Sequence, residues 1–417
     1  MSPTYAAPLL SLAQFRALVD SASTAPSPDN NQPWLFSEAD GAIDCYHDPS
    51  RALPSDVRGM FDLTGLGAAI ENICISARAE GLEPRVEAIG DDEPDQRAKR
   101  AMGPAMGPAM GPEADRGDLL SSNPTGPRHV ATVSFKTPDT SVANDPLRRH
   151  LEGRHTCRKP YSRQPLPVAA RDRIEEQVRQ FPGAQLDWLS GARALKETAR
   201  IVALADLLRF QHRPFHEELF RQLRFDRQSV VATRDGLDVR TLELPRGIPA
   251  VLKWLGDWRR MQRVHRLGLG RLLAMPSARL VRCSGAVGVL SVSGWSTSEL
   301  LTAGRALQRA WLAATAEGLA LQPLGSVPIY LAMSNRPSLA GDCHHDLADR
   351  HPCLADRLAP AQQRTLSQLK QRWERLYDAP QGRVLSMLFR IGYSRPASAR
   401  SLRRPVDELI LSCPELE

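Results

Sequence analysis

Two arginines and a threonine alternate in the segment RHTCR, where Arg154, Thr156 and Arg158 stand two residues apart. In an extended segment, side chains with this spacing point to the same side, so the three would present two guanidinium groups and a hydroxyl together. Such a trio suits a phosphate group and the polar edge of a heterocycle. The pattern R-x-T-x-R is short, and a solvated basic turn is the alternative that it leaves open.

A polar turn with an apolar anchor occupies residues 25 to 36, APSPDNNQPWLF. Its prolines exclude a regular helix. Four consecutive polar residues, 29 to 32, stand almost directly before the Trp-Leu-Phe run at 34 to 36. We interpret the apolar run as an anchor that pins the turn to its own part of the molecule.

The composition is ordinary for a globular chain of 417 residues, with 42% hydrophobic and 24% charged residues. This length allows two or three domains, or one large domain with an internal duplication. No run of about 18 apolar residues occurs, so no membrane span is expected, and the N-terminal residues lack the pattern of a signal peptide. Seven scattered cysteines favour reduced thiols, and we therefore expect a cytoplasmic location.

The net charge of +7 comes mostly from arginine, which binds phosphate and carboxylate groups through paired hydrogen bonds. A mild basic excess permits contact with nucleic acid without requiring it. The sequence contains no zinc-finger, RRM-like or KH-like motif, so we expect no nucleic-acid partner.

An internal repeat relates two helical segments at a constant offset and without gaps. Residues 67 to 82 are GAAIENICISARAEGL, and residues 304 to 319 are GRALQRAWLAATAEGL. Each segment is expected to be a helix that ends at a C′ glycine, Gly81 or Gly318. Two unrelated alanine-rich helices are the alternative, but the shared AEGL ending favours duplication, and hence two copies that pack about a pseudo-twofold axis.

The repeat divides the chain into two expected halves, residues 1–145 and 146–417. The first half is interrupted at 91–128 by a low-complexity insertion that contains AMGPAMGPAMGP. The segments at 129–135 and 382–393 are expected to be strands, whereas LALQPLGSVP (319–328) is expected to be a turn.

Two further segments contain residue types that could bind a metal ion or a membrane surface, and each also has a simpler interpretation. The stretch 342–353, DCHHDLADRHPC, gathers soft and borderline ligands in a spacing that matches no standard zinc module, so a polar surface loop is the interpretation and no metal is expected. The basic stretch 251–282 contains eight Lys/Arg and one Asp among tryptophans and leucines. It is expected to pack on the core with a solvated basic face, and a membrane-surface helix is the alternative.

Three of these features together resemble the FMN-dependent nitroreductase family. They are the turn P-S-x-x-N-x-Q-P-W that begins at Pro26, the R-x-[ST]-x-[RK] element that begins at Arg154, and the sequence GLALQPLGS that begins at Gly318. The ending, FRIGY followed by LRRP, is also similar to that family's C-terminus. The resemblance implies an α+β fold with central β-sheets flanked by helices, and FMN held at the interface of two copies.

The same resemblance implies roles for individual residues. Arg154 would hold the flavin phosphate, and Arg158 would contact the pyrimidine edge and stabilise its negative charge on reduction, which makes it the expected catalytic residue. The polar turn would reach the flavin from the other copy, the loop after the second repeat helix would offer backbone N–H groups to N5, and the basic C-terminal loop would add phosphate contacts. The expected cofactor-binding residues are Ser27, Asn30, Gln32, Arg154, His155, Thr156, Arg158, Pro323, Leu324, Gly325, Ser326, Arg403 and Arg404.

These parts are divided between the halves so that only one composite site is complete. The turn occurs in the first half, and its counterpart in the second, FPGAQLDWLSG (181–191), lacks the Asn and the Gln-Pro-Trp. The arginine pair, the loop and the basic tail occur only in the second half. The sequence therefore predicts one FMN per chain in a monomer that acts as a pseudo-dimer, as in the single-chain, two-half branch of Acg-type FMN-binding proteins. The resemblance to that branch also implies that the basic stretch 251–282 covers the flavin cavity as a lid.

The resemblance implies an oxidoreductase that transfers a hydride through flavin N5, with NAD(P)H as electron donor and a nitroaromatic, a quinone or a similar small molecule as acceptor. No dedicated general acid or nucleophile is expected, because the cofactor carries the chemistry. The alternative is a flavin-binding protein that sequesters FMN in an occluded site without turnover.

Overall fold

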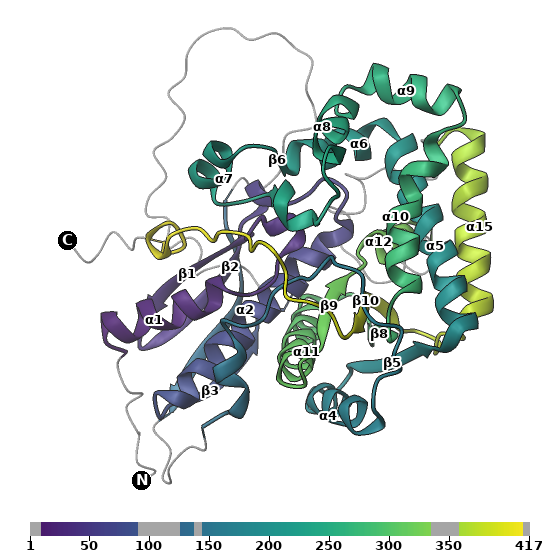
Figure 1. Ribbon diagram of the computed structural model, residues 1–417. Helices are drawn as coiled ribbons and strands as arrows, with labels where there is room; N and C mark the ends of the chain where they lie inside the picture. Colours follow the sequence, from purple (N-terminus) through teal and green to yellow (C-terminus); the bar gives the residue numbers. More distant parts are fainter. Residues whose placement is uncertain (1–9, 91–125, 137–143, 335–357, 412–417) are drawn as a thin grey trace, which may run out of the picture.

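The computed structural model describes residues 10–90, 126–136, 144–334 and 358–411. Most of the low-complexity insertion and the whole Cys/His-rich stretch at 342–353 lie outside these residues. The described chain is a mixture of helices and antiparallel sheets (Figure 1). The α+β class is thereby confirmed.

The first sheet has the strand order β1-β2-β4-β3, and all its pairs are antiparallel. One helix precedes its first strand, and a second helix joins its second strand to its third. These elements are α1 (Leu12–Ser23), β1 (Trp34–Ala39), β2 (Ala42–His47), α2 (Met60–Ala79), β3 (Glu83–Ala88) and β4 (Arg128–Lys136).

The second sheet repeats this plan in the order β5-β8-β10-β9, again antiparallel throughout. A helix again precedes the first strand, and another again joins the second strand to the third. These elements are α4 (Val168–Arg179), β5 (Gln185–Ser190), β8 (Ala286–Val292), α11 (Thr297–Ala316), β9 (Ala320–Pro323) and β10 (Val384–Gly392). The two sheets therefore have the same topology, first–second–fourth–third.

Helices α2 and α11, which contain the sequence repeat, pack against each other at the centre of the molecule (Figure 1). A Cβ atom on Gly67 would lie 2.1 Å from the carbonyl oxygen of Leu301, and one on Gly304 would lie 1.9 Å from that of Thr64. Both positions therefore require glycine. The repeat aligns Gly67 with Gly304 and Thr64 with Leu301. The two contacts are reciprocal, as contacts across a twofold axis are.

Polar contacts one turn further along the same helices are also reciprocal in position. Arg309 Nη1 lies 3.1 Å from Glu71 Oε1, and Gln308 Nε2 donates to Asn72 Oδ1 at 2.6 Å. The repeat aligns Glu71 with Gln308 and Asn72 with Arg309. The residue types differ at these aligned positions. The pairs nevertheless occupy equivalent positions on the two sides of the contact between α2 and α11, which we call the helix seam.

The expected helix ends are confirmed, and one expected turn is corrected. Gly81 and Gly318 follow the two seam helices with φ values of +75° and +68°, a left-handed conformation that glycine adopts without strain. The segment 319–328 is not a simple turn. It forms β9 and then enters α12 (Ser326–Ser334), because pairing with β10 holds residues 320–323 extended.

The second half contains a long insertion between β5 and β8. Helix α5 (Gly191–Gln211) packs on the outer face of the second sheet together with α10 (Gly270–Arg282), α12 and α15 (Pro360–Leu376). Between α5 and α10 the chain forms short elements that rise at the top of Figure 1 and that, together with the N-terminal part of α10, make up what we call the cap. They are α6 (Arg213–Gln222), β6 (Leu223–Arg224), α7 (Arg227–Thr233), β7 (Leu237–Asp238), α8 (Ile248–Leu255) and α9 (Trp258–Arg266).

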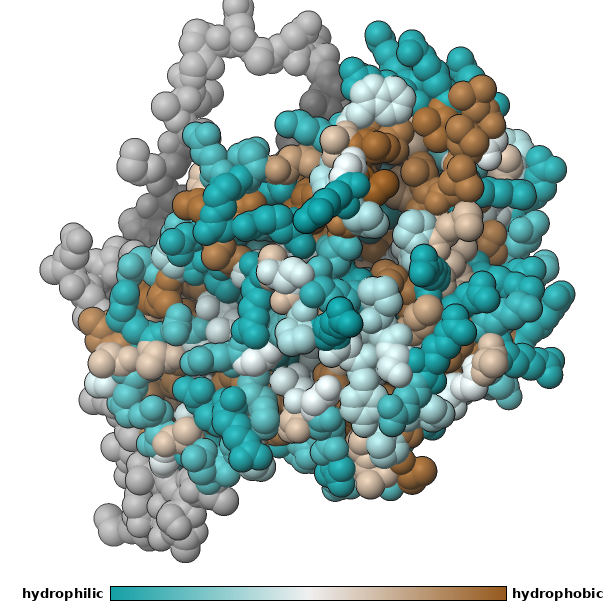
Figure 2. Space-filling view, in the orientation of Figure 1, coloured by the Kyte–Doolittle hydropathy of each residue, from teal (hydrophilic) through white to brown (hydrophobic). Residues whose placement is uncertain are grey.

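The surface of this cap is unlike the rest of the visible face. Hydrophobic side chains gather over α8 and α10, whereas hydrophilic ones dominate lower down (Figure 2). Among the described residues, no helix is both long enough and apolar enough to cross a membrane.

The C-terminal segment returns from the second half to the first. It runs from β10 across the molecule to the region of β1 (Figure 1), where the amide of Phe36 donates to Leu409 O at 2.8 Å and the amide of Leu411 donates to Phe36 O. Within the second half, the segment that contains Thr156 lies extended along the edge of β9 through a bridge to Leu321. These two additions bring the basic tail and the R-x-T-x-R segment to the same region.

Candidate functional site

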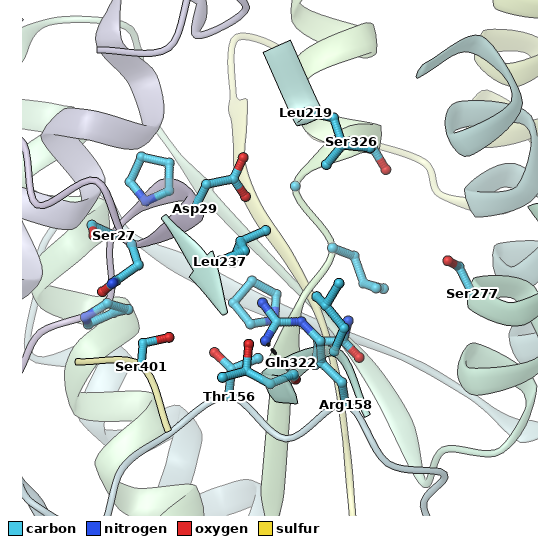
Figure 3. A pocket seen from close by; sticks show the side chains of 18 of the residues that line it. Ser27, Asp29, Thr156, Arg158, Leu219, Leu237, Ser277, Gln322, Ser326 and Ser401 are labelled. Atoms are coloured by element: carbon cyan, nitrogen blue, oxygen red, sulfur yellow. Dashed lines mark hydrogen bonds between the residues drawn. The ribbon is translucent and has the colours of Figure 1, made fainter. Parts of the chain in front are cut away.

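A cavity of about 750 Å³ lies between the two halves and below the cap. Its wall comes from the turn after α1, the start of α2, the seam helix α11, the R-x-T-x-R segment, the loop after β9, the C-terminal tail and the cap. Figure 3 shows the side chains of Ser27, Thr156, Arg158, Ser277 and Ser401 arranged around open space. The expected residues that line it are Ser27, Asn30, Arg154, His155, Thr156, Arg158, Pro323, Leu324, Gly325, Ser326 and Arg403.

The polar turn after α1 is built from backbone conformations that strongly favour polar or small residues. Asp29, Asn30 and Gln32 all have positive φ values, between 45° and 61°. Asn and Asp tolerate this left-handed region better than most side chains. Trp34 and Phe36 are fully buried immediately after it. The sequence interpretation of a polar turn with an apolar anchor is confirmed.

Gln32 and Arg404 do not line the cavity and instead hold the turn to the tail. Gln32 is fully buried, and its Nε2 donates to Asn30 O at 3.1 Å and to Arg234 O at 2.9 Å. Its Oε1 accepts the backbone N–H of Arg404 at 2.8 Å. The Arg404 side chain turns away to Glu408, since Nη2 donates to that residue's carbonyl at 2.7 Å. Both residues therefore position the cavity wall rather than form it.

Arg154 is a buried arginine with unfilled hydrogen-bonding capacity. Its Nη2 donates to Thr24 O at 2.8 Å, and its guanidinium lies 4.5 Å from the ring centroid of Trp311. Its Nε is buried and has no hydrogen-bond partner among the described residues. Buried donors are almost always paired in folded proteins, so this nitrogen is a candidate for contact with a ligand.

A cluster of arginines surrounds Arg154. Burial, together with the charges of Arg403 and Arg400, lowers the pKa of Arg154 to about 9. Burial also lowers the pKa of Arg403 to about 10. Arg403 donates to the side-chain oxygen of Asn30 and to Ala25 O, so it links the tail to the polar turn. No carboxylate hydrogen-bonds to either guanidinium in the described part of the chain, and an anion would relieve this repulsion.

Arg158 and Arg390 form a second cationic region further along the wall. Arg158 Nη1 donates to Thr241 O at 3.3 Å, and burial lowers its pKa while the charge of Asp29 opposes the shift. Arg390 is fully buried and donates through Nε to Gln322 Oε1 at 2.7 Å. A guanidinium at this place can donate to the polar edge of a planar ligand.

The loop after β9 supplies a narrow backbone edge. The amide of Leu324 donates to Leu388 O at 2.7 Å, which ties the loop to β10. A Cβ atom on Gly325 would lie 3.1 Å from the Phe61 ring, so a larger residue there would press on the first half. The hydroxyl of Ser326 donates to Asp206 at 3.4 Å. The loop therefore presents its backbone to the cavity between two elements that fix its position.

The far end of the cavity contains buried carboxyl groups. Glu218 from the cap accepts the backbone N–H of Ser55 in the first half at 2.8 Å and also its hydroxyl. Burial raises the pKa of Glu218 and of Asp206, against opposing hydrogen bonds from serines and the charge of Arg209. Arg209 also pairs with Asp29 at 3.5 Å. This network links the cap to the polar turn and to the first half.

The upper wall of the cavity is apolar and belongs to the cap. Ile248, Val251, Leu252 and Leu255 line it from α8, and several side chains line it from α10. The expectation that the basic stretch packs on the core or covers the site is confirmed, because it forms helices over the cavity. Helices α5 and α6 are separated at His212, two residues before Pro214.

The sequence interpretation missed several residues that line the cavity. Arg400 lines the cavity three residues before Arg403, and the tail therefore contributes Arg400 and Arg403 rather than Arg403 and Arg404. Trp311 also lines it, in the second copy of the repeat, where the first copy has Cys74. The repeat aligns a large aromatic residue with a small one at this position, and that difference could have identified Trp311 from the sequence.

The cavity combines a cationic end, a planar backbone edge and an apolar roof. It fits a flat, partly apolar molecule with an anionic tail. No group of His, Cys, Asp and Glu residues in the described ranges could hold a metal ion. The four cysteines in those ranges, Cys45, Cys74, Cys157 and Cys283, are free thiols.

No model of a known protein family matches the sequence. A curated relative, an uncharacterized protein of Mycobacterium tuberculosis (strain CDC 1551 / Oshkosh), is 25% identical over 339 residues, which is 81% of this chain and 42% of the relative. The chain thus spans less than half the length of that relative.

Three similar solved structures are nitroreductases. One, with bound FMN, from Bacteroides fragilis NCTC 9343, is 8% identical with a TM-score of 0.32, over 62% of this chain and 94% of that one. Another, with bound FMN, from Desulfitobacterium hafniense DCB-2, is 14% identical with a TM-score of 0.30, over 60% and 90%. The third, the FMN-dependent nitroreductase NfnB of Mycobacterium smegmatis in complex with NADPH, is 16% identical with a TM-score of 0.29, over 64% and 93%.

Proposed function

We propose that this protein binds one FMN per chain in the cavity between its halves and acts as a flavin-dependent oxidoreductase. The observation that carries the proposal is Arg154, a buried cation whose Nε has no partner among the described residues and whose neighbours are arginines. An organic phosphate satisfies both the unpaired donor and the excess positive charge. The apolar roof and the backbone edge at Gly325 suit the flat ring of the same ligand.

Different residues of the chain bind different parts of this cofactor. Arg154, Arg400 and Arg403 hold the phosphate, and Arg158 donates to the pyrimidine edge and stabilises negative charge there. Ser27 and Asn30 approach from the first half, and the loop from Pro323 to Ser326 supports the ring edge. Bound FMN supplies hydride transfer between a donor and an acceptor. NAD(P)H is the proposed donor, and a nitroaromatic, a quinone or a similar small molecule is the proposed acceptor.

We also propose that the two halves arose by duplication of one unit and that the chain works as a monomeric pseudo-dimer. The shared strand order of the two sheets and the reciprocal Gly67–Leu301 and Gly304–Thr64 contacts support this. Because the polar turn comes from the first half and Arg154 from the second, one chain completes one site. A second chain is not needed for it.

The test is the absorbance spectrum of the purified protein with the flavin content per chain, followed by NAD(P)H oxidation with a nitroaromatic or a quinone. We expect one FMN per chain and turnover with at least one donor. The variant Arg154→Ala with Arg158→Ala is expected to purify without flavin while keeping its circular dichroism spectrum. Full FMN occupancy in that double variant would contradict the site assignment.

A second candidate function is FMN sequestration without turnover. The cap favours it, because α8 and α10 cover the cavity and Glu218 fastens the cap to Ser55 of the first half. This function predicts bound flavin that dithionite reduces and that neither NADH nor NADPH reduces. Rapid reduction by a nicotinamide would exclude it. The variant Glu218→Ala, which loosens the fastening, would convert a sequestering protein into one whose flavin is accessible to NAD(P)H.

A further inference from the structure

Exposed hydrophobic side chains are concentrated on the cap. Of the ten large hydrophobic residues that are exposed in the described part of the chain, seven lie between positions 248 and 275. We call these seven the cap patch. They are Ile248, Val251, Trp254, Leu267, Leu269, Leu272 and Met275. Scattered exposed apolar residues are ordinary, but a concentration of this kind marks an interaction surface.

The same segment is strongly basic. Residues 248 to 282 contain eight lysines and arginines and a single acidic residue, Asp257. Asp257 caps the start of α9 by accepting the backbone N–H of Arg260, so its charge is already engaged. Lys253, Arg263 and Arg266 are exposed. The surface that covers the cap is therefore expected to be both anionic and apolar.

The cap patch is continuous with the mouth of the cavity. Ile248, Val251 and Leu272 line the cavity and are also 42%, 49% and 57% exposed. These three side chains therefore form the rim between the cavity and the outside, and they come from two different helices, α8 and α10. An apolar rim that stands in water is an unfavourable arrangement unless an apolar phase covers it.

We propose that the cap is a membrane-surface docking element that seats the mouth of the cavity on an anionic lipid bilayer. The exposed apolar side chains enter the boundary between headgroups and acyl chains, while the surrounding lysines and arginines contact lipid phosphates. The helices are too short and too basic to span the bilayer, and they lie along its surface. A ligand dissolved in the bilayer then enters the cavity over the rim without crossing water. The proposal does not depend on which cofactor the cavity holds.

The test is co-sedimentation of the full-length protein with vesicles. Vesicles of phosphatidylcholine mixed with phosphatidylglycerol are compared with vesicles of phosphatidylcholine alone, each at low and at high salt. We expect binding to the anionic vesicles that weakens with salt, and much weaker binding to the neutral ones. Binding that is absent from the anionic vesicles at low salt would overturn the proposal.

Matched variants separate the cap from the rest of the surface. Leu272→Ser with Met275→Ser is expected to weaken vesicle binding at least tenfold, because both side chains are exposed and apolar. The control is Leu12→Ser with Val168→Ser, which removes two apolar side chains from α1 and α4 that are more exposed than Leu272 and Met275, and it should leave binding unchanged. The charge variant Arg263→Ser with Arg266→Ser is expected to lower binding to anionic vesicles by roughly fivefold per arginine. Equal effects of the cap variant and its control would contradict the assignment.

Tryptophan fluorescence gives an independent readout of orientation. Trp254 is half exposed on α8, and its emission is expected to shift to shorter wavelength when anionic vesicles are added. The shift should disappear in Trp254→Phe, which keeps the fold because the side chain is at the surface. If the Leu272→Ser, Met275→Ser variant instead abolishes self-association of a protein that ignores vesicles, the cap is a protein interface, and the lipid proposal is wrong.

Discussion

An arginine lies on each side of the seam between α2 and α11, beside Trp311 on one side and beside the aligned residue Cys74 on the other. The charges of these two arginines have different partners. On the cavity side, Arg154 stacks on Trp311 and donates to the turn after α1. On the other side, Arg305 lies 5.1 Å from the Phe181 ring and contacts Cys74, the residue that the repeat aligns with Trp311. Arg305 donates to Glu71 at 2.9 Å, whereas Arg154 has no carboxylate partner among the described residues.

Under the proposed function, this difference separates the side of the repeated architecture that binds FMN from the side that is part of the core. A cation paired with a carboxylate, as the half-buried Arg305 is with Glu71, is satisfied within the protein and needs no ligand. A buried cation among other cations, with an unpaired donor, is stable only with an anion nearby or at the cost of a lowered pKa. The architecture is repeated, and we propose that the placement of one carboxylate decides which side binds an anion.

The largest expected effect comes from breaking the seam that the two sides share. Gly304→Ala places a Cβ against the Thr64 carbonyl, and Gly67→Ala places one against that of Leu301. Because backbone atoms cannot move aside like side-chain ends, each variant should lose about 3 kcal/mol of unfolding free energy or more, measured by urea denaturation. Since the contacts are reciprocal, the two losses should be similar.

Gly153→Ala is the control for the seam variants, because its Cβ would lie 3.5 Å from the nearest atom, an ordinary contact. It should change the free energy of unfolding by less than about 1 kcal/mol. A large loss in one seam variant and none in the other would show that the two helices do not meet symmetrically.

The next largest effect separates the two arginines. Arg154→Ala should weaken FMN binding by roughly 100-fold in a titration, because it removes charge-assisted hydrogen bonds to the phosphate. Arg305→Ala should leave FMN affinity nearly unchanged and lower stability by about 1 to 3 kcal/mol, since it removes a partner of the buried Glu71. If Arg305→Ala weakens FMN binding as much as Arg154→Ala does, the two sides are not distinguished by their charge pairing.

Much of this arrangement could be predicted from the sequence, for identifiable reasons. The seam helices follow from a gapless repeat with glycine ends, and the polar turn follows from its prolines and its apolar anchor. Both signals are local, because turn and helix-end residues act within a few positions of themselves.

The remaining features depend on contacts between distant segments. Gln32 belongs to the same polar run as Asn30, but it points to the tail because Arg404 offers its backbone N–H there. Which of the tail arginines faces the cavity depends on where the tail joins β1, and no local pattern records that register. The apolar rim of the cap likewise cannot be predicted until α8 and α10 are seen to line the same cavity.

A smaller effect concerns the pH dependence of FMN binding at Arg154, whose Nε has no partner among the described residues. In the proposed site, the FMN phosphate would bind the protonated form of Arg154, whose pKa is lowered to about 9 by burial and by Arg403 and Arg400. Binding above pH 9 therefore requires proton uptake, and FMN affinity should fall as the pH rises beyond about 9, by up to about tenfold per pH unit. In Arg154→Gln the affinity should be low throughout and less dependent on pH in this range. An equally steep decline in that variant would assign the titration to another group.

The smallest expected effect tests the aromatic face that distinguishes Trp311 from its aligned partner Cys74. Trp311→Phe keeps a buried ring at the seam but weakens the stacking of the Arg154 guanidinium, a contact worth about 0.5 to 2 kcal/mol when desolvated. FMN affinity should therefore fall several-fold, less than in Arg154→Ala. Trp295→Phe is the control, because its stacked partner Arg58 lies outside the cavity lining. If Arg154 is held by its bond to Thr24 O alone, Trp311→Phe will leave FMN affinity unchanged, and the aromatic residue will have no part in making this side the binding side.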